Sequence, residues 1–389
     1  MLRSLAFTLV VGAATAAAPP IAWQFAGPGG YINNGDAPPL VSASATQAVV
    51  AQADGSWLIG TTNGGVWRSK DIAPGLDGAS AASVKKGVSW TPVTDGQPVK
   101  CSSIGALSVS EDTKGLAYAG CGGSTSSEMG ASWNVVNSGD WAGIMETTDY
   151  GETWAMMDGT PFANYYITAI LSGSKGVLVV SARSNLYDKD KGGIWHSEAP
   201  KGGARTWKQV STTPTFNLHS LGWDALLAGY AYSTDSVGLS RDGGKTWSTW
   251  DAGIKWASAR HQPYYATFAS AHGNVFYGAY TVNLDDDRKT NSKVWMASAS
   301  DAGKGKKTAW TEVSGAGTGA PLDLDGDSMP KDRMALLADP DDANVLCACA
   351  LLLALRLALL LAEFRPPQTP RATASTWRTA WTSRRRSGP

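Results

Sequence analysis

The sequence predicts an all-β protein, a β-propeller of four-stranded antiparallel blades, and three observations support this fold class. The chain of 389 residues contains 44 Gly and 17 Trp, and only 17% of its residues are charged. This composition is typical of many short strands joined by tight turns. A turn motif ending in Trp recurs along the chain, and short alternating segments between its copies predict strands. Radially repeated sheets account for all three observations, because they leave only short, protected edges.

Two copies of the turn motif are clean, TTDYGETW at residues 147–154 and SRDGGKTW at residues 240–247. Weaker copies end at Trp90, Trp207 and Trp310. Each repeating unit is therefore about 40 to 65 residues long, which is the size of a propeller blade. The pattern predicts five complete blades and the opening of a sixth, and seven blades when the ring is whole. The residues shared by the two clean copies are Thr147, Asp149, Gly151, Thr153 and Trp154, and Ser240, Asp242, Gly244, Thr246 and Trp247.

We interpret this motif as a folding device. A carboxylate and a hydroxyl can close the turn through hydrogen bonds, and Gly admits a positive φ at little cost. The Trp places a large apolar ring between blades, where its burial contributes about 2 to 3 kcal/mol. Asp149 and Asp242 are therefore predicted to be structural rather than catalytic.

The N-terminal residues 1–18 have the pattern of a secretory signal peptide. Arg3 supplies the positive charge, an apolar segment follows, and residues 16–18 are small Ala residues at which we expect cleavage. We therefore expect a secreted or lumenal protein. In that compartment Cys101 and Cys121, which flank a predicted hairpin, form either a disulfide or two buried thiols. The formal net charge of zero argues against a nucleic-acid partner.

The propeller pattern is expected over residues 19–346 and stops abruptly there. Residues 347–389 contain seven Arg, one Glu and neither Lys nor Asp. The apolar residues 348–362 are short for a membrane helix and include Arg356, so no membrane span is predicted. The remainder is typical of disorder. We hypothesise that a wrong reading frame replaces the last blades; continuous transcript reads in the present frame across the codons for residues 346–349 would contradict this.

The motifs resemble the Asp-box (BNR-repeat) propeller superfamily over roughly residues 23–346. The segments IGTTNGGVWRS, WTPVTDGQPV and SIGALSV are similar to the opening blades of sortilin-type BNR-repeat proteins, which are often labelled glycoside hydrolase-like. The resemblance implies the fold but no single activity, because the superfamily includes sialidases, xyloglucanases, sorting receptors and assembly factors. Asn63 stands where xyloglucanases of this type are expected to carry Asp, and the Arg-Ile-Pro segment of sialidases does not occur.

The remaining polar residues match no strong catalytic or zinc motif, and Cys347 and Cys349 have no second ligand pair nearby. Residues 322–328 (LDLDGDS) predict either a calcium-binding loop or a solvated acidic loop, and residues 285–287 predict a charged hairpin tip. The calcium ligands would be Asp323, Asp325 and Asp327. Nominal glycosidase acids are Asp54, Asp140, Glu146 and Asp224. Histidines interpreted as loop or packing residues are His196, His219, His261 and His272.

Aromatic side chains outside the motif offer a better indication of ligand binding, because sugar rings and peptides both bind to aromatic faces. They are Trp133, Trp141, Tyr165, Tyr166, Trp223 and Trp256. The sequence therefore predicts a secreted Asp-box propeller that binds an extracellular glycan or protein without catalysis and without a required cofactor. The alternative is a glycoside hydrolase of the sialidase or xyloglucanase type. A third interpretation, a sorting-receptor ectodomain, requires a membrane span in a corrected C-terminus.

Overall fold

A computed structural model of the chain describes fifteen segments, and their regular structure is almost entirely β. The exceptions are a short 3-10 helix, η1 (Ser174–Gly176), and α1 (Ala299–Lys304). The described residues are 31–32, 41–42, 46–62, 64–71, 89–125, 136–138, 142–183, 192–199, 205–230, 236–254, 261–283, 286–304, 310–314, 334–339 and 346–350.

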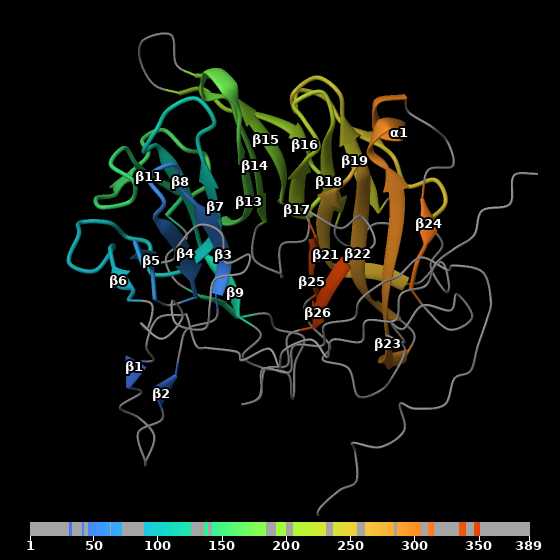
Figure 1. Ribbon diagram of the computed structural model, residues 1–389, viewed down its shortest axis with the longest axis horizontal. Helices are drawn as coiled ribbons and strands as arrows, with labels where there is room; N and C mark the ends of the chain where they lie inside the picture. Colours follow the sequence, from blue (N-terminus) through green and yellow to red (C-terminus); the bar gives the residue numbers. More distant parts are fainter. Residues whose placement is uncertain are drawn as a thin grey trace, which may run out of the picture.

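Five four-stranded antiparallel sheets follow one another along the chain, and each is one blade of a β-propeller (Figure 1). Within every blade the strands pair in chain order, and we call them A to D. Blade 1 comprises β3 (Thr46–Ala51), β4 (Trp57–Thr61), β5 (Val66–Ser69) and β6 (Thr91–Pro92). Blade 2 comprises β7 (Ile104–Val109), β8 (Ala117–Cys121), β11 (Ile144–Thr147) and β12 (Ala155–Met156). Those of blade 3 are β13 (Tyr166–Ser172), β14 (Leu178–Arg183), β15 (Gly192–Ser197) and β16 (Lys208–Ser211).

Blades 4 and 5 repeat this arrangement, and a two-stranded sheet follows them. Blade 4 comprises β17 (Thr215–Ser220), β18 (Leu226–Tyr230), β19 (Val237–Ser240) and β20 (Ser248–Thr249). Blade 5 comprises β21 (His261–Ala271), β22 (Asn274–Asn283), β23 (Asp286–Ser298) and β24 (Thr311–Glu312). The sixth sheet consists of β25 (Met334–Ala338) and β26 (Leu346–Ala350), so its second strand extends beyond residue 346, where the sequence pattern stops. The predicted fold class, five blades and the opening of a sixth, is confirmed.

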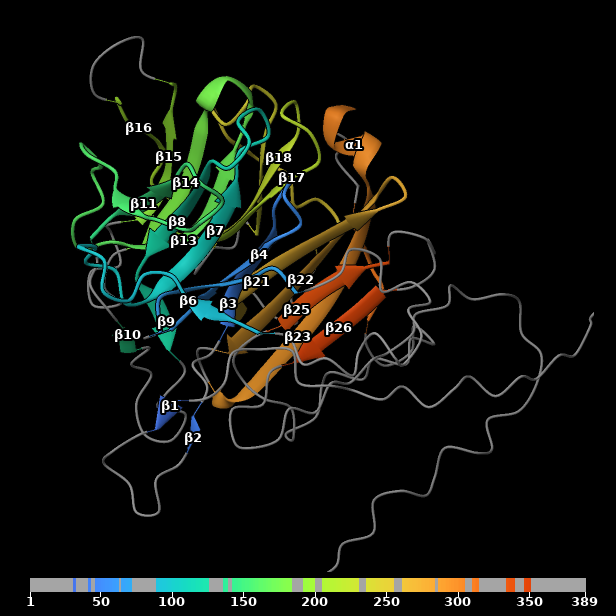
Figure 2. The ribbon, with the colours of Figure 1, turned by 60° about the vertical axis from the view of Figure 1, so that its left-hand side comes forward.

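The A strands form the inner part of the propeller. β3, β7, β13, β17, β21 and β25 contact one another in this order, so successive blades are neighbours in space. Figure 2 shows the sheets fanned out side by side. Each interface between blades encloses an apolar cluster that draws side chains from both sheets.

The antiparallel order gives the propeller two distinct faces. The A–B and C–D connections lie at one end of the strands, which we call the turn face, and the B–C and D–A connections lie at the other, which we call the insertion face. α1 connects β23 to β24 on the turn face, at the top of Figure 1. A hairpin of β9 (Gly123–Thr125) and β10 (Val136–Ser138) lies between β8 and β11 on the insertion face, and Figure 1 shows β9 at the lower end of the blade 2 strands. A further two-stranded sheet, β1 (Tyr31–Ile32) and β2 (Val41–Ser42), precedes blade 1.

Glycine residues in the B strands allow adjacent blades to approach closely. A Cβ atom built on Gly60 of β4 would lie 2.4 Å from Cγ2 of Ile104 on the next A strand, and one on Gly120 of β8 would lie 2.4 Å from Cγ2 of Ile167. Gly229 of β18 faces Ala266 in the same way, at 2.8 Å from its Cβ. Both isoleucines are fully buried. The interface therefore has room for a hydrogen atom but not for a methyl group at these positions.

A register shift recurs near the start of the A strand in each of the five four-stranded blades. The pairing of strands A and B skips one residue at Gln47, Gly105, Thr168, Phe216 and Tyr264. Such a bulge increases the local twist of the sheet. Because it occurs in all five blades, the blades share backbone geometry as well as strand order.

We predict that Gly120→Ala lowers the free energy of unfolding by about 1 to 3 kcal/mol, because the added methyl group collides with Ile167 at the blade interface. Urea denaturation followed by tryptophan fluorescence measures the change. Gly96→Ala is the matched control, since Gly96 has open space around it and its φ of +73° gives only a backbone cost of about 1 kcal/mol. A Gly120→Ala protein as stable as the wild type would contradict this packing.

Candidate functional site

The turn between β11 and β12 is closed by the side chains that the sequence motif shares. Asp149 Oδ1 accepts hydrogen bonds from Thr147 Oγ1 at 2.7 Å and from the backbone N of Thr153 at 2.9 Å. Its Oδ2 accepts from Thr153 Oγ1 at 2.6 Å. The backbone N of Gly151 donates to Thr147 Oγ1 at 3.0 Å, and Trp154 Nε1 donates to the Gly151 carbonyl at 3.2 Å. Both oxygens of the carboxylate are therefore engaged within the turn.

The turn between β19 and β20 repeats this network. Asp242 Oδ1 accepts from Ser240 Oγ at 2.9 Å and from the backbone N of Thr246 at 2.9 Å, and its Oδ2 accepts from Thr246 Oγ1 at 2.7 Å. Gly244 N donates to Ser240 Oγ at 2.8 Å, and Trp247 Nε1 donates to the Gly244 carbonyl at 3.2 Å. The five shared positions thus have the same hydrogen-bonding roles in both copies.

The lowered pKa values of Asp149 and Asp242 also reflect their hydrogen bonds within the turns. Partial burial acts to raise the pKa of Asp149, but the combined hydrogen bonds from Thr153, Thr147 and the backbone outweigh it, and the pKa lies below its ordinary value. Asp242 shows the same balance, with burial opposed by Thr246, Ser240 and backbone donors. A carboxyl held ionised by its own turn is poorly suited to act as a general acid.

The glycine of each turn packs on the preceding blade. A Cβ on Gly151, whose φ is +79°, would lie 2.7 Å from Leu58 of blade 1, and one on Gly244, whose φ is +88°, would lie 2.5 Å from Val179 of blade 3. Trp154 is buried in the apolar cluster between blades 1 and 2. The turns therefore stabilise the blade interfaces.

Asp54, one of the candidate acids, belongs to an ion-pair network between blades 1 and 2. Its Oδ2 lies 3.0 Å from Arg68 Nη2, and Arg68 Nε donates to the Tyr150 carbonyl at 2.6 Å. Arg68 Nη1 lies 3.6 Å from Glu152 Oε1. Burial acts to raise the pKa of Asp54, but hydrogen bonds from Ser56 and the charge of Arg68 outweigh it and lower the pKa. Asp54 therefore has a structural role on the turn face.

The other described candidate acids are dispersed over the propeller. Asp224 lies in the A–B connection of blade 4, on the turn face, and Glu146 lies in β11 of blade 2. Together with Asp54 of blade 1, they therefore belong to three different blades. Asp140 and Asn63 lie outside the described residues.

The described histidine side chains contribute to packing or to backbone contacts. His219 stacks on Phe268 with ring centroids 5.9 Å apart, and its Nε2 lies 2.8 Å from Ser270 Oγ of the next blade. Burial lowers the pKa of His219 to about 4. His196 is buried, and burial together with Lys245 lowers its pKa. His272 Nε2 lies 3.2 Å from the Asp339 carbonyl oxygen, whereas the side chain of His261 lies outside the described residues.

The three described aromatic candidates are largely occupied by packing. Tyr166 is buried, and Tyr165 packs edge-on against Trp195 at a centroid distance of 5.4 Å. Trp223 lies over Gly173 of blade 3, and its Nε1 approaches Glu111 Oε2 of blade 2 at 3.3 Å. The remaining candidates lie outside the described residues: Trp133, Trp141 and Trp256.

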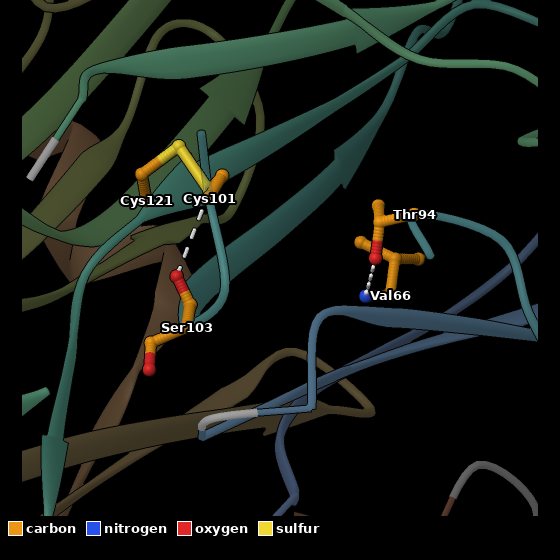
Figure 3. The surroundings of a disulfide bond; sticks show 5 residues. All are labelled: Val66, Thr94, Cys101, Ser103 and Cys121. Atoms are coloured by element: carbon orange, nitrogen blue, oxygen red, sulfur yellow. Dashed lines mark hydrogen bonds between the residues drawn. A yellow bond between two sulfur atoms is a disulfide. The ribbon is translucent and has the colours of Figure 1, made fainter. Parts of the chain in front are cut away.

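A disulfide joins Cys101 to Cys121 on the insertion face, with the Cα atoms 5.4 Å apart (Figure 3). The sequence had left this pair as either a disulfide or two thiols. Both residues are buried, and Cys101 Sγ lies 3.6 Å from the Ser103 carbonyl oxygen. Nearby, the backbone N of Val66 donates to Thr94 Oγ1 at 3.1 Å. The bond ties the connection between blades 1 and 2 to the end of β8, directly before the β9–β10 hairpin.

A second rigid feature lies on the insertion face between blades 3 and 4. The guanidinium of Arg183, the last residue of β14, lies 4.5 Å from the ring centroid of Phe216 and 5.7 Å from that of Tyr166. Blade 5 extends this face, because β22 and β23 remain paired as far as Asn283 and Asp286. The insertion face therefore carries the stacked Arg183 side chain and the extended ends of β22 and β23.

The structure gives no sign of a metal centre or a membrane helix in the residues that it describes. No group of three His, Cys, Asp or Glu side chains gathers there, and no helix among those residues is long and apolar enough to span a bilayer. The predicted calcium loop, with Asp323, Asp325 and Asp327, lies outside the described residues, as do residues 1–18 and 351–389.

Comparisons with known proteins give fold similarities at low sequence identity. No protein-family model matches the chain, and no curated protein matches it. Among solved structures, the chain is similar to YCF48 bound to D1 peptide, with a TM-score of 0.45 and 11% identity over 79% of this chain and 76% of that one. It is also similar to a Trypanosoma rangeli sialidase, with a TM-score of 0.41 and 12% identity over 80% of this chain and 53% of that one.

A Penicillium chrysogenum α-L-arabinanase complexed with arabinobiose gives a TM-score of 0.37 and 14% identity over 67% of this chain and 79% of that one. Because the three TM-scores are below 0.5, the class of the protein follows from its own sheets and not from these similarities. Five four-stranded blades in sequential contact define a β-propeller.

We predict that Asp149→Ala lowers the free energy of unfolding by about 1 to 3 kcal/mol, because it removes the acceptor for Thr147 and Thr153, and the hydroxyl of Thr147 is buried. Chemical denaturation measures the loss. Asp158→Ala, which removes an exposed carboxylate without a hydrogen bond in the described chain, should change stability by less than about 0.5 kcal/mol. Equal effects of the two substitutions would show that the turn network is not needed for folding.

His219 predicts a pH dependence of stability. Its folded pKa of about 4 lies below the ordinary value of 6.5, so the unfolded chain binds the proton first. Stability is therefore complete above pH 6.5 and declines as the pH falls toward 4. Between pH 7.5 and 5.0 the wild type should lose about 1 to 2 kcal/mol more than His219→Gln, as measured by urea titration. Parallel losses in the two proteins would mean that His219 is not buried in its neutral form.

Proposed function

We propose that this protein is a secreted Asp-box propeller, of the sortilin-type BNR-repeat kind, which binds an extracellular glycan or protein on its insertion face without catalysis. One observation carries the proposal. The motif acids Asp149 and Asp242 use both carboxylate oxygens in their own turns, on the face opposite the β9–β10 hairpin. The repeated motif turns therefore stabilise the fold, and the residues of the insertion face can vary without disturbing these turns.

The construction of the insertion face supports a binding role. Binding residues are commonly placed on loops that a rigid scaffold positions. Here the Cys101–Cys121 disulfide fixes the base of the hairpin, and Arg183 stacked on Phe216 fixes the neighbouring edge. A buried disulfide is also consistent with the oxidising compartment that the signal-like residues 1–18 indicate.

A glycoside hydrolase of the sialidase or xyloglucanase type is the alternative. Such an enzyme generally needs two carboxylates about 5 to 10 Å apart. Asp54 is held by Arg68 on the turn face, which removes one candidate. Glu146 in β11 and Asp224 in the A–B connection of blade 4 are the described candidate acids that the alternative retains.

We predict that replacing the β9–β10 hairpin with a short Gly-Ser linker reduces ligand affinity at least tenfold and leaves folding intact. The ligand is first found by screening the secreted protein on arrays of glycans and extracellular proteins, and affinity is then measured by calorimetry. Lys245→Ala, an exposed change on the turn face, is the control and should bind like the wild type. Equal affinity of the hairpin variant and the control would contradict the proposed face.

The same preparation should be incubated with fluorogenic glycosides and polysaccharides. The binding module is expected to release no product. Turnover that Glu146→Gln abolishes while binding persists would establish the hydrolase instead.

A further inference from the structure

Blades 1 and 3 carry different ionisable residues at one equivalent buried position. The segments GGVWRSK of blade 1 and GGIWHSE of blade 3 align without a gap, and Arg68 and His196 stand at the same place in them. Arg68 pairs with Leu58 on the neighbouring B strand, and His196 pairs with Val179. Both are buried, with 8% and 7% of their surface exposed. The two positions can therefore be compared directly.

Both side chains face the motif turn of the following blade. The residues two positions earlier, Val66 and Ile194, belong to the apolar clusters that blade 1 forms with blade 2 and blade 3 with blade 4. Side chains two positions apart on a strand point to the same face, so Arg68 and His196 also face the following blade. The glycine of each motif turn packs on the B-strand residue that pairs with them. Each side chain therefore lies beneath a motif turn.

Arg68 is bound by the turn above it. Its Nε donates to the Tyr150 carbonyl of the blade 2 turn at 2.6 Å, and its Nη2 lies 3.0 Å from Asp54 Oδ2. Its Nη1 lies 3.6 Å from Glu152 Oε1, in the same turn. Arginine stays protonated throughout the physiological pH range, so the charge of this side chain is the same at neutral and at mildly acidic pH.

His196 lacks the contacts that Arg68 makes. Its Nε2 is buried and has no hydrogen-bond partner in the part of the chain that the structure describes. In the blade 4 turn above it, Lys245 stands at the motif position that Glu152 holds in blade 2. Lys245 Nζ pairs with Glu198 Oε1 of blade 3 at 2.9 Å. A neutral imidazole beside a cation thus replaces the arginine and its carboxylates.

Four charged groups act on His196. Lys245 and Asp242 belong to the blade 4 turn, and Lys208 and Glu198 belong to blade 3. Burial is the largest cause that lowers the pKa of His196, Lys245 is the next, and together with Lys208 they outweigh the attraction of the two carboxylates. A separated interface exposes the imidazole to water and therefore binds the proton first. The contact is complete above pH 6.5 and weakens as the pH falls below that value.

We propose that the interface between blades 3 and 4 is an acid-sensitive hinge, at which the blade 4 motif turn separates from blade 3 when His196 binds a proton. The proton adds a buried positive charge beside Lys245, and burial of such a charge is costly. The equivalent interface between blades 1 and 2 stays closed, because Arg68 carries its charge and its partners at every pH in this range. This hinge is a property of the fold and does not depend on the ligand proposed above.

Hydrogen exchange measured by mass spectrometry tests the proposal, with peptides that cover residues 240–247 and 147–154. Equivalent amides are hydrogen-bonded in the two turns, so the blade 2 turn is an internal control. Rates at pH 7.5 and 5.0 are corrected for the intrinsic effect of pH on exchange. Protection of the blade 4 turn should fall about fivefold or more at pH 5.0, and that of the blade 2 turn by less than about twofold.

Two variants assign the response to His196. His196→Gln stays neutral and should reduce the response of the blade 4 turn to about twofold or less, and the remainder belongs to His219 on the other side of blade 4. The exchange Glu198→Lys with Lys245→Glu keeps an ion pair but places a carboxylate where the cation acts most strongly on His196. It should also weaken the response. Both exchanged side chains are 57% exposed, so the fold tolerates the change.

Three results would overturn the proposal. They are a blade 4 turn equally protected at both pH values, an equal loss of protection in the blade 2 turn, and a full response that persists in both variants. Circular dichroism checks that each variant is folded. If His196→Gln does not fold, the charge exchange decides alone, and a full wild-type response in it would count against the hinge.

Discussion

The close approach of B strands to the A strand of the next blade, at Gly60, Gly120 and Gly229, is the constraint on which the packing of the blades depends. At Gly60 and Gly120 there is no room for a Cβ, because Ile104 and Ile167 fill that space and are fully buried. Burial of each isoleucine contributes about 2 to 3 kcal/mol. This contact sets the distance between these neighbouring sheets, and the apolar clusters fill the space between them.

The motif turns reinforce the same contact from the edge of the sheet. Their carboxylates hold the loop in a shape that presses Gly151 on Leu58 and Gly244 on Val179, each in the preceding blade. On the turn face Asp149 and Asp242 are thus occupied within their own turns. The insertion face has a different construction, in which a disulfide and paired strands support projecting segments. This separation lets the segments of the insertion face vary without weakening the motif turns.

The sequence by itself determined the blade size, the fold class and the motif turns, because the turn residues interact within eight positions of the chain, as Thr147, Asp149 and Thr153 do. It left Cys101 and Cys121 open between two states. The tertiary structure decided the pairing of Arg68 with Asp54 and Glu152, the stacking of Arg183, and the register shift in the A strand of each four-stranded blade. These depend on where separate sheets meet, and the bulge falls on residues as different as Gly105 and Phe216, so no local pattern encodes them.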